Sequence, residues 1–138
     1  MDKFDQQIIN RLKQNARESL AAIGRDIGLS RSAVAERIQR LEERGIIRGY
    51  TLRLGEAGQR AVQAYFQLSF SPFRLDDLLP VILRIPELHF GHALSGEVDL
   101  ILFAETDSME RLNQIRRQLE QLPDLKRLLT CPVLQSIS

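Results

Sequence analysis

The sequence predicts an α+β protein made of two small domains, a three-helix domain over residues 1–54 and a βαββαβ domain over residues 61–138. Three observations support this prediction. Apolar residues recur at helical spacing in the first part of the chain, and they alternate with polar residues in the second. Glycine, proline and serine punctuate both parts at turn positions. The glycines and polar residues at 55–60 predict a hinge between the domains.

Composition narrows the class of protein. The 138-residue chain has 43% hydrophobic residues, enough for real cores, but no apolar run approaches the roughly 20 residues that span a bilayer. Its N-terminus lacks a secretory pattern and its one cysteine, Cys131, cannot form an internal disulfide, so a cytoplasmic location without a membrane partner is expected. Residues 1–60 carry 12 Lys and Arg against 8 Asp and Glu, whereas residues 61–138 carry 7 against 10. A basic first domain suggests a polyanionic partner.

Three helices are expected in the first domain. Asp2, Ser19 and Ser30 are good N-cap residues, and each precedes an apolar pattern of helical period. Asn15, Gly28 and Gly45 are the expected stops, with glycine accepting the left-handed conformation that a tight turn needs. The positions expected to be buried are Phe4, Ile8 and Leu12, then Leu20, Ile23 and Ile27, then Val34, Ile38 and Leu41.

The turn between the second and third helices is typical of a helix-turn-helix. Such motifs join two short helices through three or four residues that often include glycine, and Gly28 fits this description. Gly24 is small enough for close approach of the helices, although Arg37 stands where an apolar residue is common. The alternation of residues 46–54 predicts a strand after the third helix, which makes the module a winged helix-turn-helix. Spacing alone leaves open an ordinary three-helix bundle with a glycine turn.

The third helix has an outward face suited to double-stranded DNA. Arginine pairs with guanine, glutamine with adenine, and glutamate accepts from cytosine in a major groove. Arg37, Arg44 and Arg48 are expected to contact phosphates. The alternative is a solvated helix face with ion pairs such as Glu36–Arg40. The predicted DNA-binding residues are Ser30, Arg31, Ser32, Glu36, Arg37, Gln39, Arg40, Arg44 and Arg48.

The second domain is expected to be ferredoxin-like, with four antiparallel strands and helices on one face. Pro80 fits the first of its helices only within the first turn, and Pro132 indicates an edge strand or a bulge. Ser95-Gly96-Glu97 is expected to join two strands as a hairpin, and Ser108 to cap the second helix. The expected ranges are a strand over 61–70, a helix over 76–84, strands over 88–94 and 98–104, a helix after 108 and a strand over 125–137.

The sheet face away from the helices is expected to be apolar. A lone domain rarely leaves so much apolar surface open, so this face is expected to pack against another subunit of a homo-oligomer. The alternative is that the linker strand and first helix of the same chain cover it. The residues concerned are Tyr65, Ile101, Phe103, Leu129 and Val133.

Two stretches resemble a known family. "RSAVAERIQRLEERGIIRGYT" and "HALSGEVDLIL" together resemble the Lrp/AsnC, or feast/famine, regulators over nearly the whole chain. The resemblance implies a prokaryotic transcription regulator that forms dimers and often octamers. It also implies an amino-acid effector bound between dimers, by Ser95, Gly96, Glu97, Asp99 and Thr130 in this chain.

The effector loop departs from the family pattern in one respect, because Glu97 stands where the family often has Asp. Physically, Asp99 is able to pair with an ammonium, while free backbone N–H groups near Gly96 accept a carboxylate. The alternative is that Gly96 serves only the turn and that Asp99 is a solvated acid at a strand end.

Two other functions remain open. Siroheme decarboxylases share this architecture, but His89 and His92 are expected on opposite faces of one strand, and no residue cluster has metal-ligand spacing. No enzyme activity, cofactor or metal is therefore expected, and an absorbance spectrum would test for a tetrapyrrole. A DNA-organising protein with little sequence preference is the other alternative, which the ratio of specific to random DNA affinity would distinguish.

Overall fold

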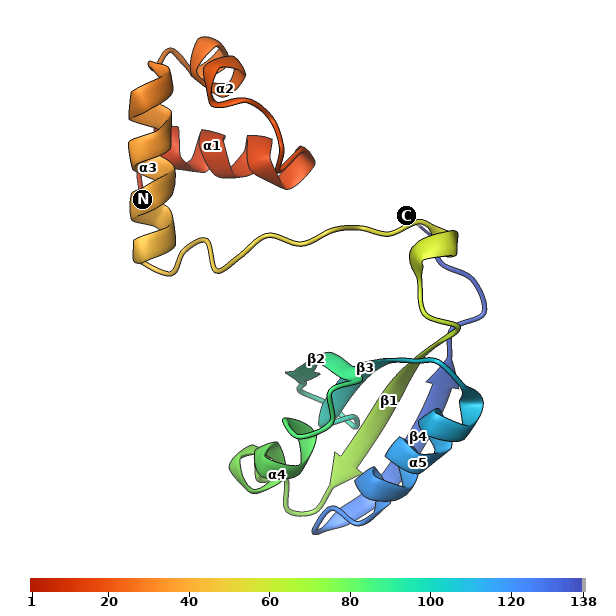
Figure 1. Ribbon diagram of the computed structural model, residues 1–138. Coiled ribbons are helices and arrows are strands. Elements are labelled where there is room, and N and C mark those ends of the chain that lie inside the picture. The colour runs from red at the N-terminus through yellow and green to blue at the C-terminus, as the bar shows by residue number, and fades with distance from the viewer. Residues whose placement is uncertain (138) are drawn as a thin grey trace. The chain divides into compact units, whose positions relative to one another are not determined.

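The computed structural model describes residues 1–137 and has two compact units, Met1–Arg53 and Leu54–Ser138 (Figure 1). Ser138, the end of the second predicted domain, lies outside the described residues. Each unit has a hydrophobic core of its own.

The first unit contains the three predicted helices. Each begins after the predicted N-cap, whose side chain accepts a hydrogen bond from the backbone two or three residues into the helix. Gly28 ends the second helix in the left-handed conformation, with φ of 82°. The helices are α1 (Lys3–Gln14), α2 (Leu20–Ile27) and α3 (Arg31–Glu43).

The core of this unit is small. Ile8, Ile23 and Val34, one from each helix, have no exposed surface, and half-buried leucines and isoleucines surround them. Gly24 lies so close to the turn that a Cβ there would overlap the carbonyl oxygen of Leu29. The close approach of α2 to the following turn therefore requires glycine at position 24.

The strand predicted over 46–54 is wrong. Residues 48–54 are irregular, and the hinge that follows contains a short 3-10 helix at Glu56–Gly58. Alternation of apolar and polar side chains favours a β-strand, but a strand forms only when a second strand provides hydrogen-bond partners for its backbone. The first unit offers none, because all of its other elements within the described residues are helices.

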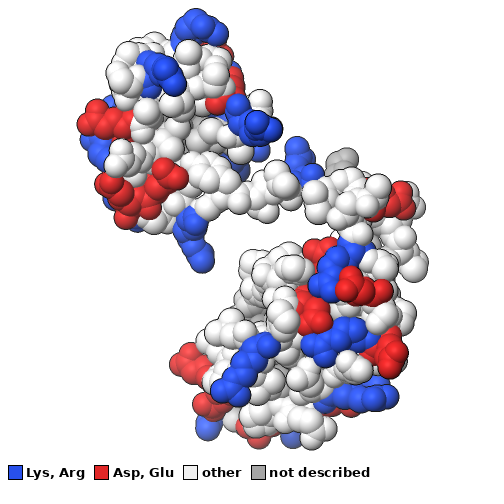
Figure 2. Space-filling model, viewed as in Figure 1, with Lys and Arg blue, Asp and Glu red and all other residues white. Residues whose placement is uncertain are grey.

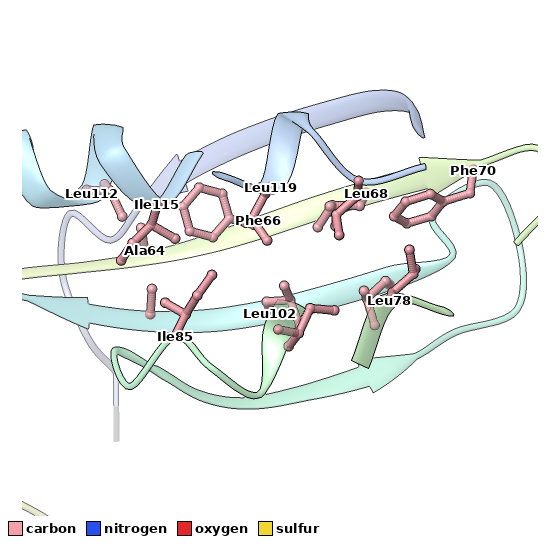
Figure 3. Packing of buried hydrophobic residues seen from close by; sticks show 14 residues of the cluster. Ala64, Phe66, Leu68, Phe70, Leu78, Ile85, Leu102, Leu112, Ile115 and Leu119 are labelled. Carbon is pink, nitrogen blue, oxygen red and sulfur yellow. The ribbon is translucent and has the colours of Figure 1, made fainter. Parts of the chain in front are cut away.

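The second unit has the predicted βαββαβ order and the strand order β2-β3-β1-β4, all antiparallel. Both helices contribute to a single core on one face of the sheet, where Phe66 and Leu68 meet Leu78 of one helix and Ile115 of the other (Figure 3). The elements are β1 (Val62–Phe70), α4 (Leu75–Ile82), β2 (Leu88–Ala93), β3 (Leu100–Thr106), α5 (Met109–Glu120) and β4 (Leu125–Pro132). The ferredoxin-like prediction is confirmed.

Some boundaries differ from the prediction. Pro80 lies in the second turn of α4, not the first, and it is exposed, so water can satisfy the carbonyl that loses its partner. The hairpin turn is longer than three residues, because β2 ends at Ala93 and β3 begins at Leu100. β4 stops at Pro132 and does not reach residue 137, but it is an edge strand, as that proline predicted.

The other sheet face carries an aromatic cluster. Tyr65 and Phe90 both pack against Phe103, with ring centroids 5.0 and 5.1 Å away. The expectation that His89 and His92 lie on opposite faces is wrong. A register shift between Leu88 and Phe90 places His89 beside Phe103, on the face that His92 also occupies.

Replacing Gly24 by alanine should destabilise the first unit. Alanine favours helix by about 1 kcal/mol, but overlap with a backbone atom cannot be relieved by rotating a side chain, so we expect a net loss of about 1–2 kcal/mol. Gly49→Ala is the control, because a Cβ there has nothing within 4 Å. Urea denaturation followed by circular dichroism measures both variants, and equal midpoints would contradict the packing described for Gly24.

Candidate functional site

The exposed face of α3 is the first candidate site. Val34 and Leu41 are buried against the rest of the unit, which leaves the opposite side of the helix in solvent. All of the predicted base-reading residues on this helix are exposed: Arg31, Ser32, Glu36, Gln39 and Arg40. Their side chains share one helix face, as a 100° step per residue predicts.

The start of α3 is held by Ser30. Its Oγ accepts a hydrogen bond from the backbone N–H of Ala33 at 3.2 Å, and it lies 3.3 Å from Oγ of Ser32. Ser30 is thus an N-cap whose side chain already has a structural role. The adjacent Arg31 is exposed at the first helical position.

Four of the predicted DNA-contacting arginines remain available. Arg31, Arg40, Arg44 and Arg48 are exposed and make no ion pair within residues 1–137. Figure 2 shows Lys and Arg side chains projecting from the N-terminal unit. The Glu36–Arg40 pair, which the alternative of a solvated helix face included, is absent from the described residues, and Gln39 instead donates to Oε1 of Glu43 at 3.0 Å.

Arg37 has partners that the sequence did not predict. Its Nη1 lies 2.6 Å from Asp2 and 3.1 Å from Asp5, both in the first turn of α1. The pKa of Asp2 is lowered mainly by the hydrogen bond that its side chain accepts from the backbone N–H of Asp5, and next by the one from Arg37. The pKa of Arg37 is raised by its hydrogen bonds to the Asp2 and Asp5 carboxylates. Nη1 serves both carboxylates, and Nε and Nη2 of Arg37 make no hydrogen bond within residues 1–137, so the expected phosphate contact at Arg37 stays a prediction.

The loop between β2 and β3 is the second candidate site. No backbone N–H of residues 95–98 donates a hydrogen bond within residues 1–137, and Gly96 has φ of 111°. The loop is tied to the end of β1, where Ser69 Oγ donates to the carbonyl of Glu97 at 2.6 Å. Asp99 Oδ2 accepts from the backbone of Phe70 at 2.8 Å, so this carboxylate is more than a solvated strand-end acid.

Thr130 is not brought to this loop within one chain. It lies on β4 opposite Phe66, which is itself opposite Leu102 on β3. Strand spacings of about 4.8 Å and rises of about 3.3 Å per residue therefore put Thr130 on the order of 14 Å from Asp99. Its hydroxyl is buried and has no hydrogen-bond partner among the described residues.

An apolar cavity of about 310 Å³ lies between α4 and β2. Gly91 and Ala93 form part of its wall, with Leu79 and Leu83 opposite and Leu102 from β3. Ala93 and Leu100, which flank the loop, also line it. The sequence analysis did not predict this cavity. Gly91 and Ala93, two small residues on the helix-facing side of β2, could have indicated it, because small side chains leave space beneath a helix.

Two kinds of site are not found among the described residues. None of the helices is long and apolar enough to cross a membrane. Within residues 1–137, no three His, Cys, Asp or Glu side chains gather as a metal ion would require.

Family comparison assigns both units. Residues 1–42 match the AsnC-type helix-turn-helix domain, and residues 63–138 match the Lrp/AsnC ligand binding domain. This chain belongs to the Lrp/AsnC family. It is a transcriptional regulator of that type with a ligand-binding domain, and its helix-turn-helix is a DNA-binding module.

Relatives of the family share most of their length with this chain. The regulator LrpB of Bacillus subtilis is 31% identical over 120 residues, which cover 86% of this chain and 80% of LrpB. Ptr1 of Methanocaldococcus jannaschii is 30% identical over 83% of this chain and 78% of its own. Both are named as transcriptional regulators of the helix-turn-helix type.

Solved structures agree with the fold. A Neisseria meningitidis transcriptional regulator in complex with L-Met has a TM-score of 0.81 and 26% identity, covering 100% of this chain and 92% of its own. A feast or famine regulatory protein of M. tuberculosis, complexed with L-methionine, has a TM-score of 0.84 and 25% identity, covering 99% and 94%.

Ser30→Ala and Ser32→Ala should differ in stability. Removing the Ser30 hydroxyl leaves the N–H of Ala33 without its cap, which typically costs about 1 kcal/mol. Ser32 makes no bond to the helix backbone among the described residues, so its loss should change stability by less than about 0.5 kcal/mol. Urea denaturation of the full chain measures the free energy of unfolding of both variants. A larger loss for Ser32→Ala than for Ser30→Ala would contradict the role of Ser30 as the N-cap of α3.

Proposed function

We propose that this chain is a sequence-specific DNA-binding regulator whose DNA binding or assembly responds to an amino-acid effector. The observation that carries the DNA part is the exposed face of α3, which holds arginine, glutamine and glutamate opposite a buried seam. A helix of this kind, at the second position of a helix-turn-helix, enters the major groove in known complexes.

The proposed roles follow from side-chain chemistry. Arg31 and Arg40 are suited to guanine, Gln39 to adenine, and Glu36 to the amino group of cytosine. Arg44 and Arg48 lie toward the C-terminal end of α3 and just beyond it, where unpaired cations suit backbone phosphates. Ser30 and Ser32 lie at the N-terminal end of α3, where a hydroxyl and a helix N-terminus together favour a phosphate.

The loop between β2 and β3 supports the effector part. Four consecutive backbone N–H groups have no partner in the described chain and so remain available as donors to the carboxylate of an amino acid. Asp99 uses Oδ2 for Phe70, which leaves Oδ1 to pair with the ammonium. Ser95, Gly96, Glu97 and Asp99 are the proposed contacts. Thr130 would belong to the same site only if another subunit supplied it.

The neighbouring cavity favours an apolar amino acid. Its wall includes the two residues that flank the loop, so an effector held at the loop could extend an aliphatic side chain into it. The L-methionine in two similar structures has such a side chain. We therefore propose methionine, leucine and isoleucine as the first effectors to test.

We infer that the regulator is a homo-oligomer. Phe90 is 50% exposed and Leu129 39% exposed on the sheet face opposite the helices. Packing two such faces about a two-fold axis would bury both aromatic clusters. A dimer is the proposed unit, and a higher assembly such as an octamer would be built from it.

Gln39→Ala and Arg40→Ala should weaken binding to a selected DNA site while leaving the fold intact. Each lost bidentate base contact costs about 1–3 kcal/mol, or roughly 5- to 150-fold in affinity. Arg84→Ala is the charge-matched control, because this exposed arginine lies at the end of α4 in the other unit. Fluorescence anisotropy with the selected site and with random DNA measures the effect. Equal losses on the two duplexes would mean that these residues contact only phosphates.

Asp99→Asn should abolish stabilisation by the effector. The amide retains an oxygen for the N–H of Phe70 but removes the charge that pairs with an ammonium. The wild type should gain roughly 2.7 kcal/mol at 100 times the dissociation constant. Gly96→Val should also lose binding, because φ of 111° is unfavourable for a β-branched residue.

A thermal-shift screen against the twenty amino acids identifies the effector, and calorimetry then compares the variants. Glu110→Gln, an exposed acid at the start of α5, serves as the control. If Asp99→Asn binds the effector as tightly as the wild type, the ligand lies elsewhere and Gly96 serves only the turn.

A further inference from the structure

The guanidinium of Arg37, in the middle of α3, is enclosed by the first turn of α1. Its Nη1 contacts Asp2 Oδ2 at 2.6 Å and Asp5 Oδ1 at 3.1 Å, and its Cζ lies 5.1 Å from the ring centroid of Phe4. Two carboxylates and an aromatic face at the start of α1 thus hold one cation from another helix. Each is a favourable partner for arginine.

Arg37 and Asp5 are largely shielded from solvent, whereas Asp2, at the edge of the cluster, is exposed. The side chain of Arg37 is 21% exposed and that of Asp5 only 12%. Asp5 is also the only buried charged residue among the described residues of the first unit. A carboxylate at such a position is stable only with a partner, and removing the partner leaves an uncompensated charge.

The same carboxylates also build the start of α1. The backbone N–H of Asp5 donates to Asp2 Oδ1 at 2.9 Å, and the N–H of Asp2 donates to Asp5 Oδ2 at 3.4 Å. Each carboxylate therefore gives one oxygen to this capping box and the other to Arg37. Because the cap fixes the orientation of both carboxylates, it also fixes the position of the arginine between them.

Few other contacts determine how α3 sits on α1. The fully buried hydrophobic side chains of the first unit are Ile8, Ile23, Val34 and Leu41, a small set of shape-tolerant aliphatic groups. Such a core permits small rotations of a helix more readily than directional hydrogen bonds do. Base-edge contacts, in contrast, require side chains placed within about 0.5 Å.

We propose that Arg37 is a positioning residue, which fixes the orientation of α3 by binding Asp2 and Asp5 and so contributes to sequence discrimination without contacting DNA. This inference rests on the proposed function. Arg40 and Arg44 line the adjoining groove of about 270 Å³ and make no ion pair within residues 1–137, so they remain free for DNA. Two carboxylates beside Arg37 would in addition repel a phosphate.

Asp5→Asn separates this inference from a phosphate contact, because the two models predict different effects on the ratio of specific to random DNA affinity. If only charge matters, removing an acid near DNA raises the affinity for both duplexes and leaves their ratio unchanged. If Arg37 positions α3, Asp5→Asn should instead lower the ratio of specific to random DNA affinity, and Arg37→Met should lower it similarly. We expect a loss of roughly tenfold in that ratio for each variant. The double variant Asp5→Asn/Arg37→Met should have a ratio no lower than that of the more impaired single variant, because both substitutions break the same interaction.

The measurement uses the full chain, a selected DNA site and a random duplex at several salt concentrations. In the positioning model, random-DNA affinity and the salt slope of Arg37→Met stay at wild-type values. A phosphate contact would instead reduce the slope by about 0.9, and that result would overturn the inference. Arg44→Met is the control, since the loss of that free arginine should reduce the slope.

Circular dichroism and thermal melting of each variant show whether a lower ratio comes from a misplaced α3 or from loss of the folded state. If Arg37→Met does not fold, Asp2→Asn removes only the more exposed carboxylate, whose side chain is 54% exposed, and should still lower the ratio. Variants that melt earlier but keep the wild-type ratio when folded would overturn the inference and leave the proposed function standing. A wild-type chain that prefers no DNA sequence would overturn both.

Discussion

In the proposed function, sequence recognition by this regulator depends on the orientation of α3. Only four hydrophobic side chains of the first unit are fully buried beneath this helix: Ile8, Ile23, Val34 and Leu41. Polar contacts around these side chains therefore decide the geometry. Arg37 joins α3 to the start of α1, while Arg11 joins the end of α1 to Glu18, just before α2, and to Asp26 in the last turn of α2. Exposed ion pairs contribute little stability, but a network that connects all three helices restricts their relative rotation.

The loop between β2 and β3, the proposed effector site, is constrained in a different way. Its C-terminal side is tied by backbone and side-chain bonds to the last residues of β1, and alternate residues of that strand are packed into the core of the second unit. The tip keeps its N–H groups free and its glycine at positive φ. A loop that is held rigidly at its base and has N–H groups without partners at its tip is suited to binding a small zwitterion. Such a loop loses little conformational entropy when the ligand binds. A change in assembly would then follow from contacts that the bound effector makes with a neighbouring subunit.

The sequence predicted what local chemistry determines. N-caps at Asp2, Ser19 and Ser30 were correct because a cap depends on residues within one turn, and strand alternation over 61–70 was correct because one face of β1 is buried. Non-local features were missed. The strand over 46–54 lacks a pairing strand in its unit, and the bulge that brings His89 and His92 to one face leaves no signature in spacing. The outward residues of α3 followed from helical period, but period could not show that Arg37 reaches Asp2 and Asp5, over thirty positions away.

The most direct test of the account is selection of DNA from a random pool by the full chain, followed by affinity measurements at one fixed salt concentration. A two-fold oligomer carrying two copies of α3 should select a pseudo-palindrome with half-sites about one helical turn apart, or a multiple of that spacing. The selected site should bind at least about 10³-fold more tightly than random DNA. A pool that shows no enriched sequence, or a ratio near one, would contradict sequence-specific recognition by α3 and would favour a DNA-organising role.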